Sequence, residues 1–139
     1  MTTKIAIAGA KGRMGKNLIR SGLANPHTDV VGIFDISEIG QDFLDEIGLP
    51  HKIASTKESS FESADVIIDF TSPKALYSFT ESAVANKTGL VVGTTGLDEQ
   101  HFNLLKQTGK TTKIFYAPNM SFGVNSFFSI ARKAASYLK

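Results

Sequence analysis

Residues 4–15 read KIAIAGAKGRMG, a short apolar run followed by glycines at positions 9, 12 and 15. The pattern predicts a strand over residues 4–8, a tight turn and then a helix. Glycines in such a turn let backbone N–H groups at the helix N-terminus approach a phosphate closely. Gly9 would allow the sharp turn, Gly12 would leave room for a pyrophosphate, and Gly15 would let the helix pack against the sheet. The spacing G-x-x-G-x-x-G departs from the commoner G-x-G-x-x-G, so a strand-to-helix turn without a ligand stays open.

The composition is that of a single soluble domain. The chain has 139 residues, of which 42% are hydrophobic and 20% charged, a balance that favours a folded core over disorder. A net charge of +2 gives no case for nucleic acid or a membrane surface as a partner. No apolar run approaches the ~18 residues of a membrane span, and the glycines interrupt any signal peptide. Cysteine is absent, which excludes disulfides and is compatible with a cytoplasmic location.

Strand and helix patterns alternate along the rest of the chain. Strands are expected at residues 30–34, 51–55, 64–70, 90–92 and 114–116. Helices are expected from the glycine turn to residues 25–26, as a short irregular helix within 40–50 that ends at Gly48, from residues 72–73 to residues 86–89, from residues 98–99 onward, and over residues 124–138. Because several of the strands are apolar on both faces, helices should cover both sides of the sheet. The predicted fold class is α/β, with a doubly wound, mostly parallel sheet of the Rossmann type.

Helical spacing also predicts which side chains the helices bury. The first helix would bury Met14, Leu18, Ile19 and Leu23. The helix after Pro73 would bury Leu76, Phe79, Ala83 and Val84. The three histidines, His27, His51 and His101, lack metal-ligand spacing and are interpreted as surface residues.

The end of the second strand carries a carboxylate that points to a dinucleotide. Asp35 lies 20 residues after Gly15, where a dinucleotide-binding fold places the acidic residue that accepts hydrogen bonds from the adenosine ribose. Asp35 would repel a 2′-phosphate, and Ile36 supplies no cation for one. The sequence therefore favours NADH over NADPH. Lys11 or Arg13 could still reach a 2′-phosphate from the glycine turn, so NADPH stays open.

Three further strand ends carry turn residues. They lie at residues 70–73, 93–96 and 117–119. Each alone could be a helix-capping turn, with Thr71 or Ser72 as an N-cap. Because the carboxyl ends of parallel strands meet at one edge, their joint occurrence favours a ligand-lined edge. Asn119 offers an amide that could hold the carboxamide of a nicotinamide, and Asn125 is either a second polar anchor or part of the helix N-terminus.

Four motifs in order carry a specific resemblance. They are IAGAKGRMG at 7–15, DFTSP at 69–73, GTTG at 93–96 and APNMSFGVN at 117–125. Together they resemble the dihydrodipicolinate reductase (4-hydroxy-tetrahydrodipicolinate reductase) family. The resemblance implies a cytoplasmic NAD(P)H-dependent oxidoreductase that reduces 4-hydroxy-tetrahydrodipicolinate to tetrahydrodipicolinate in diaminopimelate and lysine biosynthesis. Residues 1–139 would form its dinucleotide-binding domain.

The resemblance also implies the cofactor contacts. They map onto Gly9, Ala10, Lys11, Gly12, Arg13, Met14, Asp35, Phe70, Thr71, Gly93, Thr94, Thr95, Ala117, Pro118, Asn119 and Met120. Two residues depart from the family pattern: Ile36 stands where members that favour NADPH often carry a basic residue, and Ser72 stands where family members can carry an arginine. Both lean toward NADH.

In this family a second domain follows the last motif, holds the catalytic residues and the dicarboxylate substrate, and builds a homotetramer. That domain is absent from this chain, so no catalytic residue and no metal ligand is assigned. The chain alone is expected to bind dinucleotide and to turn over little substrate. Two alternatives stay open, namely a non-catalytic dinucleotide sensor and the N-terminal domain of another NAD(P)-dependent dehydrogenase.

Overall fold

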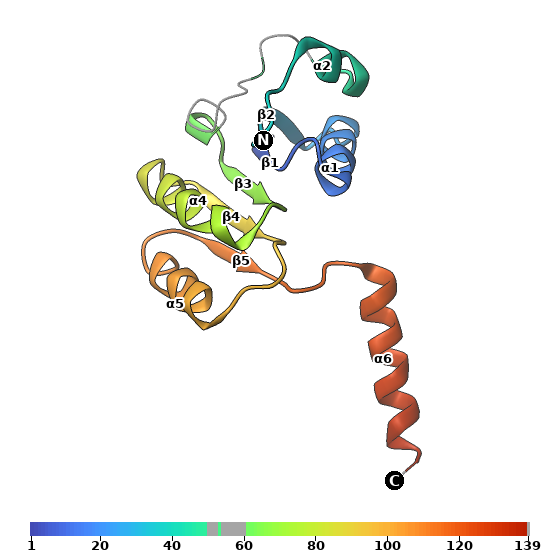
Figure 1. Ribbon diagram of the computed structural model, residues 1–139. Coiled ribbons are helices and arrows are strands. Elements are labelled where there is room, and N and C mark those ends of the chain that lie inside the picture. Colours follow the sequence, from blue (N-terminus) through green and yellow to red (C-terminus); the bar gives the residue numbers. More distant parts are fainter. Residues whose placement is uncertain (50–52, 54–60, 139) are drawn as a thin grey trace.

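A parallel sheet forms the centre of the molecule (Figure 1). The computed structural model describes residues 1–49, 53 and 61–138. Five strands in this part of the chain pair in the order β2-β1-β3-β4-β5, and every neighbouring pair is parallel. Their bounds are β1 Thr3–Ala8, β2 Thr28–Phe34, β3 Val66–Asp69, β4 Gly89–Val92 and β5 Ile114–Tyr116. The helices are α1 Arg13–Ala24, α2 Gln41–Ile47, α4 Pro73–Ala85, α5 Glu99–Thr108 and α6 Phe122–Ser136.

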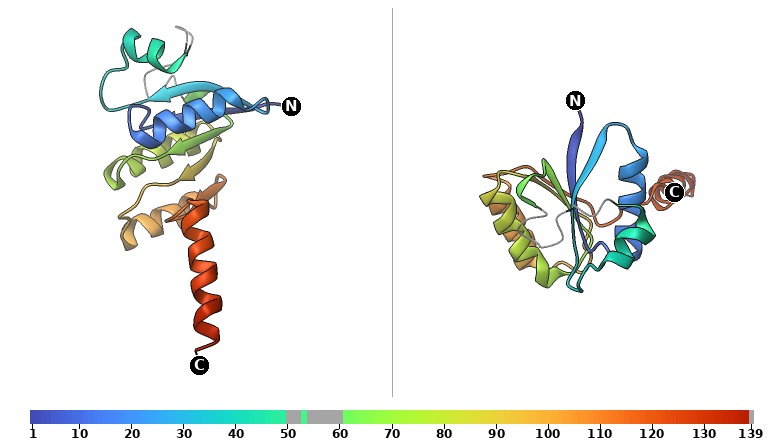
Figure 2. Two further views of the ribbon diagram at one scale, coloured as in Figure 1. Left: turned by 90° about the vertical axis from the view of Figure 1, so that its right-hand side faces the viewer. Right: turned by 90° about the horizontal axis from the view of Figure 1, so that it is seen from above.

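Helices cover both faces of the sheet, as the sequence predicts. Helices α1 and α2 lie on one face and α4 and α5 on the other (Figure 2). Strand β1 shows why, because alternate side chains of a strand point to opposite faces. Ile5 and Ile7 belong to the hydrophobic cluster under α1 and α2, and Ala6 and Ala8 belong to the cluster under α4 and α5. The doubly wound α/β fold is therefore confirmed.

The predicted buried face of α1 is partly wrong. Ile19 is buried, but Met14 and Leu23 are 47% and 45% exposed. The helix instead packs through Gly15 and Gly22, where an added Cβ would lie 2.0 Å from the Gly9 carbonyl oxygen and 2.8 Å from a Val30 methyl carbon. Gly15 brings the axis of α1 close to the glycine turn, and Gly22 brings it close to strands β1 and β2. Met14 and Leu23 therefore lie at the sides of this contact and stay exposed.

Glycine and proline in the sequence predicted the end of α2 and the start of α4. Gly48 adopts a left-handed conformation at φ 73° and ends α2, as a glycine at that position commonly does.

Val84, predicted to be buried in α4, is 37% exposed, and Thr80 is buried instead. The predicted strand at 51–55 and His51 lie outside the described residues, apart from Ile53.

One histidine prediction is wrong. The side chain of His101 is only 12% exposed, and its Nδ1 lies 2.6 Å from an Asp98 carboxylate oxygen. Asp98 in turn accepts the His101 backbone N–H, so the two residues form a capping box at the start of α5. These hydrogen bonds from His101 hold the pKa of Asp98 below its usual range. His27 is exposed, as predicted.

Helix α6 extends away from the sheet (Figure 1), and none of its described residues is buried. Phe122, Phe127 and Phe128 are 88%, 64% and 56% exposed. Among the described helices, none has the length and apolar character needed to cross a membrane.

Candidate functional site

Two cavities lie along the edge of the sheet where the strands end. The Asn119 cavity has a volume of about 520 Å³ and is lined by Gly12, Arg13, Met14, Phe70, Thr71, Gly93, Thr94, Thr95, Ala117, Pro118, Asn119, Met120 and Ser121. The Asp35 cavity has a volume of about 510 Å³ and is lined by Gly9, Lys11, Gly12, Phe34, Asp35, Ile36, Phe70, Thr71, Ser72, Ala75, Ser78 and Phe79. Both are lined by Gly12, Phe70 and Thr71. The cavities therefore share a wall built from the glycine turn and the end of β3.

The structure gathers the residues that the sequence singles out. Of the predicted cofactor contacts, all but Ala10 line one or both cavities. Ala10 is fully buried in the core beneath α1, and its backbone N–H donates to the Phe34 carbonyl oxygen at 3.0 Å. Its place in the structure is that of a packing residue that fixes the turn. Ile36, Ser72, Ser78 and Ser121 also line the cavities, although the resemblance assigns them no contact.

The glycine turn has the backbone that the sequence predicts. Gly9 adopts φ 82°, and a Cβ there would lie 2.9 Å from the Phe70 carbonyl oxygen. Gly12 precedes α1 as its N-cap, and no side chain caps the first turn of the helix. That turn also contains no acidic residue and begins with Arg13. A helix N-terminus of this kind, with a cation beside it, favours an anion.

Asp35 is held against the glycine turn. One carboxylate oxygen accepts the Lys11 backbone N–H at 2.9 Å and the other accepts the Ser37 N–H at 3.1 Å. The Lys11 ammonium donates to the Glu38 carbonyl oxygen at 3.1 Å. Arg13 lines the Asn119 cavity and is not among the residues that line the Asp35 cavity. Of the two cations left open by the sequence, Lys11 is therefore the one that lies beside Asp35.

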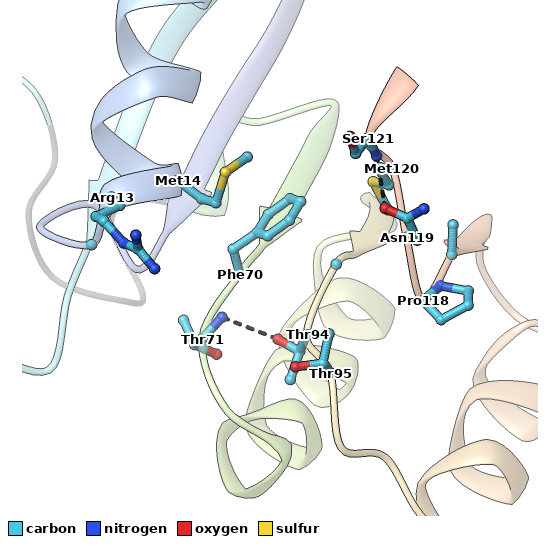
Figure 3. A pocket seen from close by; sticks show the side chains of 13 residues that line it. Arg13, Met14, Phe70, Thr71, Thr94, Thr95, Pro118, Asn119, Met120 and Ser121 are labelled. Carbon is cyan, nitrogen blue, oxygen red and sulfur yellow. Dashed lines mark hydrogen bonds between the residues drawn. The ribbon is translucent and has the colours of Figure 1, made fainter. Parts of the chain in front are cut away.

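Asn119 is oriented by its neighbours. Its side-chain oxygen accepts the Ser121 N–H at 3.0 Å, and its amide nitrogen donates to Asn125 Oδ1 at 3.3 Å. Asn125 Nδ2 also donates to the Asn119 carbonyl oxygen at 3.4 Å. Asn125 thus lies in the first turn of α6 and holds Asn119 by hydrogen bonds, while lining neither cavity. Figure 3 shows Asn119, Met120 and Ser121 on one side of the cavity, across from Met14 and Phe70.

Gly93 leaves room for an aromatic ring between the strand ends. A Cβ at this position would lie 2.2 Å from Cζ of Phe70. The Phe70 ring therefore rests directly on the backbone at the end of β4. Because Phe70 lines both cavities, the glycine at position 93 helps to set the shape of the wall they share.

One buried carboxylate lies beneath this wall. Asp69, the last residue of β3, is 0% exposed. It accepts hydrogen bonds from the Thr71 N–H at 2.9 Å, from the Thr71 hydroxyl at 2.5 Å and from the Thr94 hydroxyl at 3.1 Å. Burial raises the pKa of Asp69, and the hydrogen bonds from the two threonines oppose that rise. The sequence carried a signal for this role, an acidic residue ending an otherwise apolar buried strand.

Within the described residues, no group of three or more His, Cys, Asp or Glu side chains could hold a metal ion. The site is instead made of a glycine turn, a helix N-terminus, a carboxylate at the end of β2 and amide and hydroxyl groups at later strand ends. On a doubly wound parallel sheet, this arrangement defines a Rossmann-type domain of the class found in NAD(P)-dependent dehydrogenases.

A family model described as "Dihydrodipicolinate reductase, N-terminus" matches residues 3–120. The chain therefore belongs to the dihydrodipicolinate reductase family, a family of oxidoreductases, and corresponds to the N-terminal part of its members. This confirms the resemblance found in the four motifs.

Curated relatives agree with this assignment. The chain is 40% identical over 144 residues to a 4-hydroxy-tetrahydrodipicolinate reductase of Cupriavidus metallidurans, covering 97% of this chain and 53% of the relative. It is 38% identical over 140 residues to the enzyme of the same name from Ralstonia nicotianae, again covering 97% and 53%. The chain thus spans about half the length of these relatives.

The fold also matches a solved structure of the family. The dipicolinate-bound dihydrodipicolinate reductase from Paenisporosarcina sp. TG-14 aligns with a TM-score of 0.74 and 25% identity, over 99% of this chain and 55% of that one. Other solved structures, most of them titled dehydrogenases, align at TM-scores of 0.53 to 0.65 with 14% to 18% identity, which shows a shared fold alone. The family assignment therefore replaces the alternative of another dehydrogenase.

Proposed function

We propose that this chain binds NADH across the two cavities and forms the cofactor half of an enzyme that reduces 4-hydroxy-tetrahydrodipicolinate to tetrahydrodipicolinate. The observation that carries the proposal is that the two cavities lie side by side and share Gly12, Phe70 and Thr71 in their linings. A dinucleotide has two nucleosides joined by a pyrophosphate, and this site has two cavities that meet at the glycine turn, with Gly12, the N-cap of α1, in both linings.

Each part of the site would bind one part of the cofactor. Asp35 would accept hydrogen bonds from the adenosine ribose in the Asp35 cavity, and the N-terminus of α1 would bind the pyrophosphate. Asn119 and Thr94 would hold the nicotinamide half in the Asn119 cavity. When bound, the cofactor supplies the hydride for the reduction. The protein residues bind and orient it, and the substrate would be a heterocyclic dicarboxylate.

The contacts around Asp35 support a preference for NADH. Its carboxylate would repel a 2′-phosphate, and the adjacent Ile36 is 97% exposed and uncharged. Lys11 donates to a carbonyl oxygen, and Lys16 pairs with Glu46 at 2.7 Å. Each ammonium therefore already directs one of its three N–H donors at a protein oxygen.

A cation at position 36 should change this preference. We expect Ile36→Arg to raise NADPH affinity by about tenfold or more, because a guanidinium pairs well with phosphate. Affinity for NADH should stay within about twofold, because the side chain at 36, although it lines the Asp35 cavity, is almost fully exposed and leaves the contacts of Asp35 unchanged. Calorimetric titrations of both cofactors measure the change. Ile36→Gln is the uncharged control, and an equal gain in that variant would contradict the electrostatic explanation.

The proposed reaction needs a separate test. The chain is joined to the part of the Cupriavidus relative that lies beyond its match, and NADH oxidation is followed with and without 4-hydroxy-tetrahydrodipicolinate. We expect oxidation that depends on this substrate. A fusion that binds NADH but oxidises none with the substrate present would contradict the reductase activity and favour a dinucleotide sensor.

We also propose that the reductase acts as a homotetramer in the cytoplasm.

A further inference from the structure

The end of β3 and the end of β4 are joined by one hydrogen-bonded cluster. The Thr71 N–H donates both to Asp69 Oδ1 at 2.9 Å and to Thr94 Oγ1 at 3.0 Å. The Thr94 hydroxyl donates to Asp69 Oδ2 at 3.1 Å, and the Thr71 hydroxyl donates to Asp69 Oδ1. Figure 3 shows the bond between Thr71 and Thr94 beneath the Asn119 cavity. Asp69 and Thr94 are 25 residues apart in the sequence. The cluster thus holds the loop after β3 against the loop after β4.

The cluster also fixes the direction of both hydroxyl groups. An ionised carboxylate accepts hydrogen bonds and cannot donate them, and a threonine hydroxyl has one proton to donate. Because both hydroxyl protons are directed at Asp69, the two threonines present only lone pairs to a ligand. Thr94 Oγ1 already accepts the Thr71 N–H, so Thr71 keeps the greater capacity to accept.

We propose that Asp69 is a positioning residue that locks Thr71 onto Thr94 and makes both hydroxyls hydrogen-bond acceptors toward the cofactor. Thr71 lines both cavities and Thr94 lines the Asn119 cavity. The groups that they would recognise are donors, namely ribose hydroxyls and the carboxamide NH₂ of the nicotinamide. This inference rests on the proposed function, because it concerns how the same site recognises its cofactor.

Asp69→Asn tests the proposal with little change of shape. An asparagine offers one acceptor oxygen and an amide donor, so one threonine hydroxyl loses its acceptor and is free to turn its proton toward the ligand. We expect NADH affinity to fall about tenfold or more at a temperature where the variant is fully folded. Thr108→Val is the control, since it removes a buried hydroxyl that bonds to Leu104 in α5 and lines neither cavity. We expect it to stay within about twofold of the original chain.

A second pair of variants keeps the proposal testable if Asp69→Asn does not fold. Thr94→Val removes the hydroxyl at nearly constant shape, and Thr94→Ser retains it. We expect the valine variant to lose NADH affinity by about tenfold and the serine variant to recover most of it. A serine variant as weak as the valine variant, or a folded Asp69→Asn variant that binds NADH as the original chain does, would overturn the proposal.

A readout without ligand separates this inference from the proposed function. Hydrogen exchange at the Thr71 N–H should accelerate about tenfold or more in Asp69→Asn and stay near the original rate in Thr108→Val. If the original chain bound no NADH while exchange accelerated in this way, the proposed function would fail and the positioning by Asp69 would stand. Unchanged exchange at Thr71 would overturn the positioning itself.

Discussion

Replacing Gly15 with alanine should lower the free energy of unfolding by about 3 kcal/mol, the upper part of the usual range for overpacking. The added Cβ would lie 2.0 Å from the Gly9 carbonyl oxygen and 2.7 Å from Ala10 Cα. Both are backbone atoms, so no side-chain rotation can relieve the clash. Helix α1 would have to move away from the turn, and the wall shared by the two cavities would move with it.

Helix propensity predicts the opposite sign, which makes the experiment decisive. In an open helix position, alanine is more stable than glycine by up to about 1 kcal/mol. Gly123 in α6 supplies that control, since the nearest atom to its added Cβ is 4.0 Å away. Urea denaturation should show a lower midpoint for Gly15→Ala and an unchanged or higher midpoint for Gly123→Ala. Equal midpoints in Gly15→Ala and the original chain would contradict the close packing of α1.

Asp35→Ala should weaken NADH binding by about 10-fold to 100-fold, because hydrogen bonds to a charged group contribute about 1.5 to 3 kcal/mol. The substitution removes the proposed ribose acceptor. It also leaves the Lys11 and Ser37 backbone N–H groups without the carboxylate that accepts them. NADPH should lose less affinity than NADH, because the same change removes the repulsion of its 2′-phosphate.

Calorimetric titration of each cofactor measures both effects. Asp29→Ala is the matched control, since Asp29 is an exposed carboxylate near the other end of the same strand, β2. It should bind NADH as the original chain does. If Asp29→Ala and Asp35→Ala weakened NADH equally, a general charge effect would explain the loss and the specific role of Asp35 would be wrong.

The elements that depend on local chemistry were predictable from the sequence. Glycine and proline set the ends of α1, α2 and α4, and the apolar runs gave the strands of the sheet. Because the carboxyl ends of parallel strands share an edge, the sequence also predicted that Gly12, Thr94 and Asn119 would lie near one another. They line the same cavity.

The features that escaped prediction depend on distances between elements. Met14 and Leu23 are exposed because Gly15 and Gly22 set the depth at which α1 packs, and helical periodicity contains no information on depth. His101 caps its own helix, although the usual residue at that position of a capping box is Glu or Gln.

Asp69 shows the same limit most clearly. Its partners Thr71 and Thr94 follow different strands, so only the pairing of β3 with β4 brings the three residues together. The sequence placed the threonines at the site but gave no reason to connect them to this carboxylate.

The central claim is that the two cavities form one dinucleotide site, and its most direct test is calorimetric titration of residues 1–139 with NADH and, separately, NADPH. We expect NADH to bind at one site per chain with micromolar affinity, and NADPH to bind more weakly because of Asp35 and Ile36. Tighter binding of NADPH would assign the choice of cofactor to Lys11. Binding of neither cofactor to the folded chain would contradict the claim and leave the glycine turn as a structural turn alone.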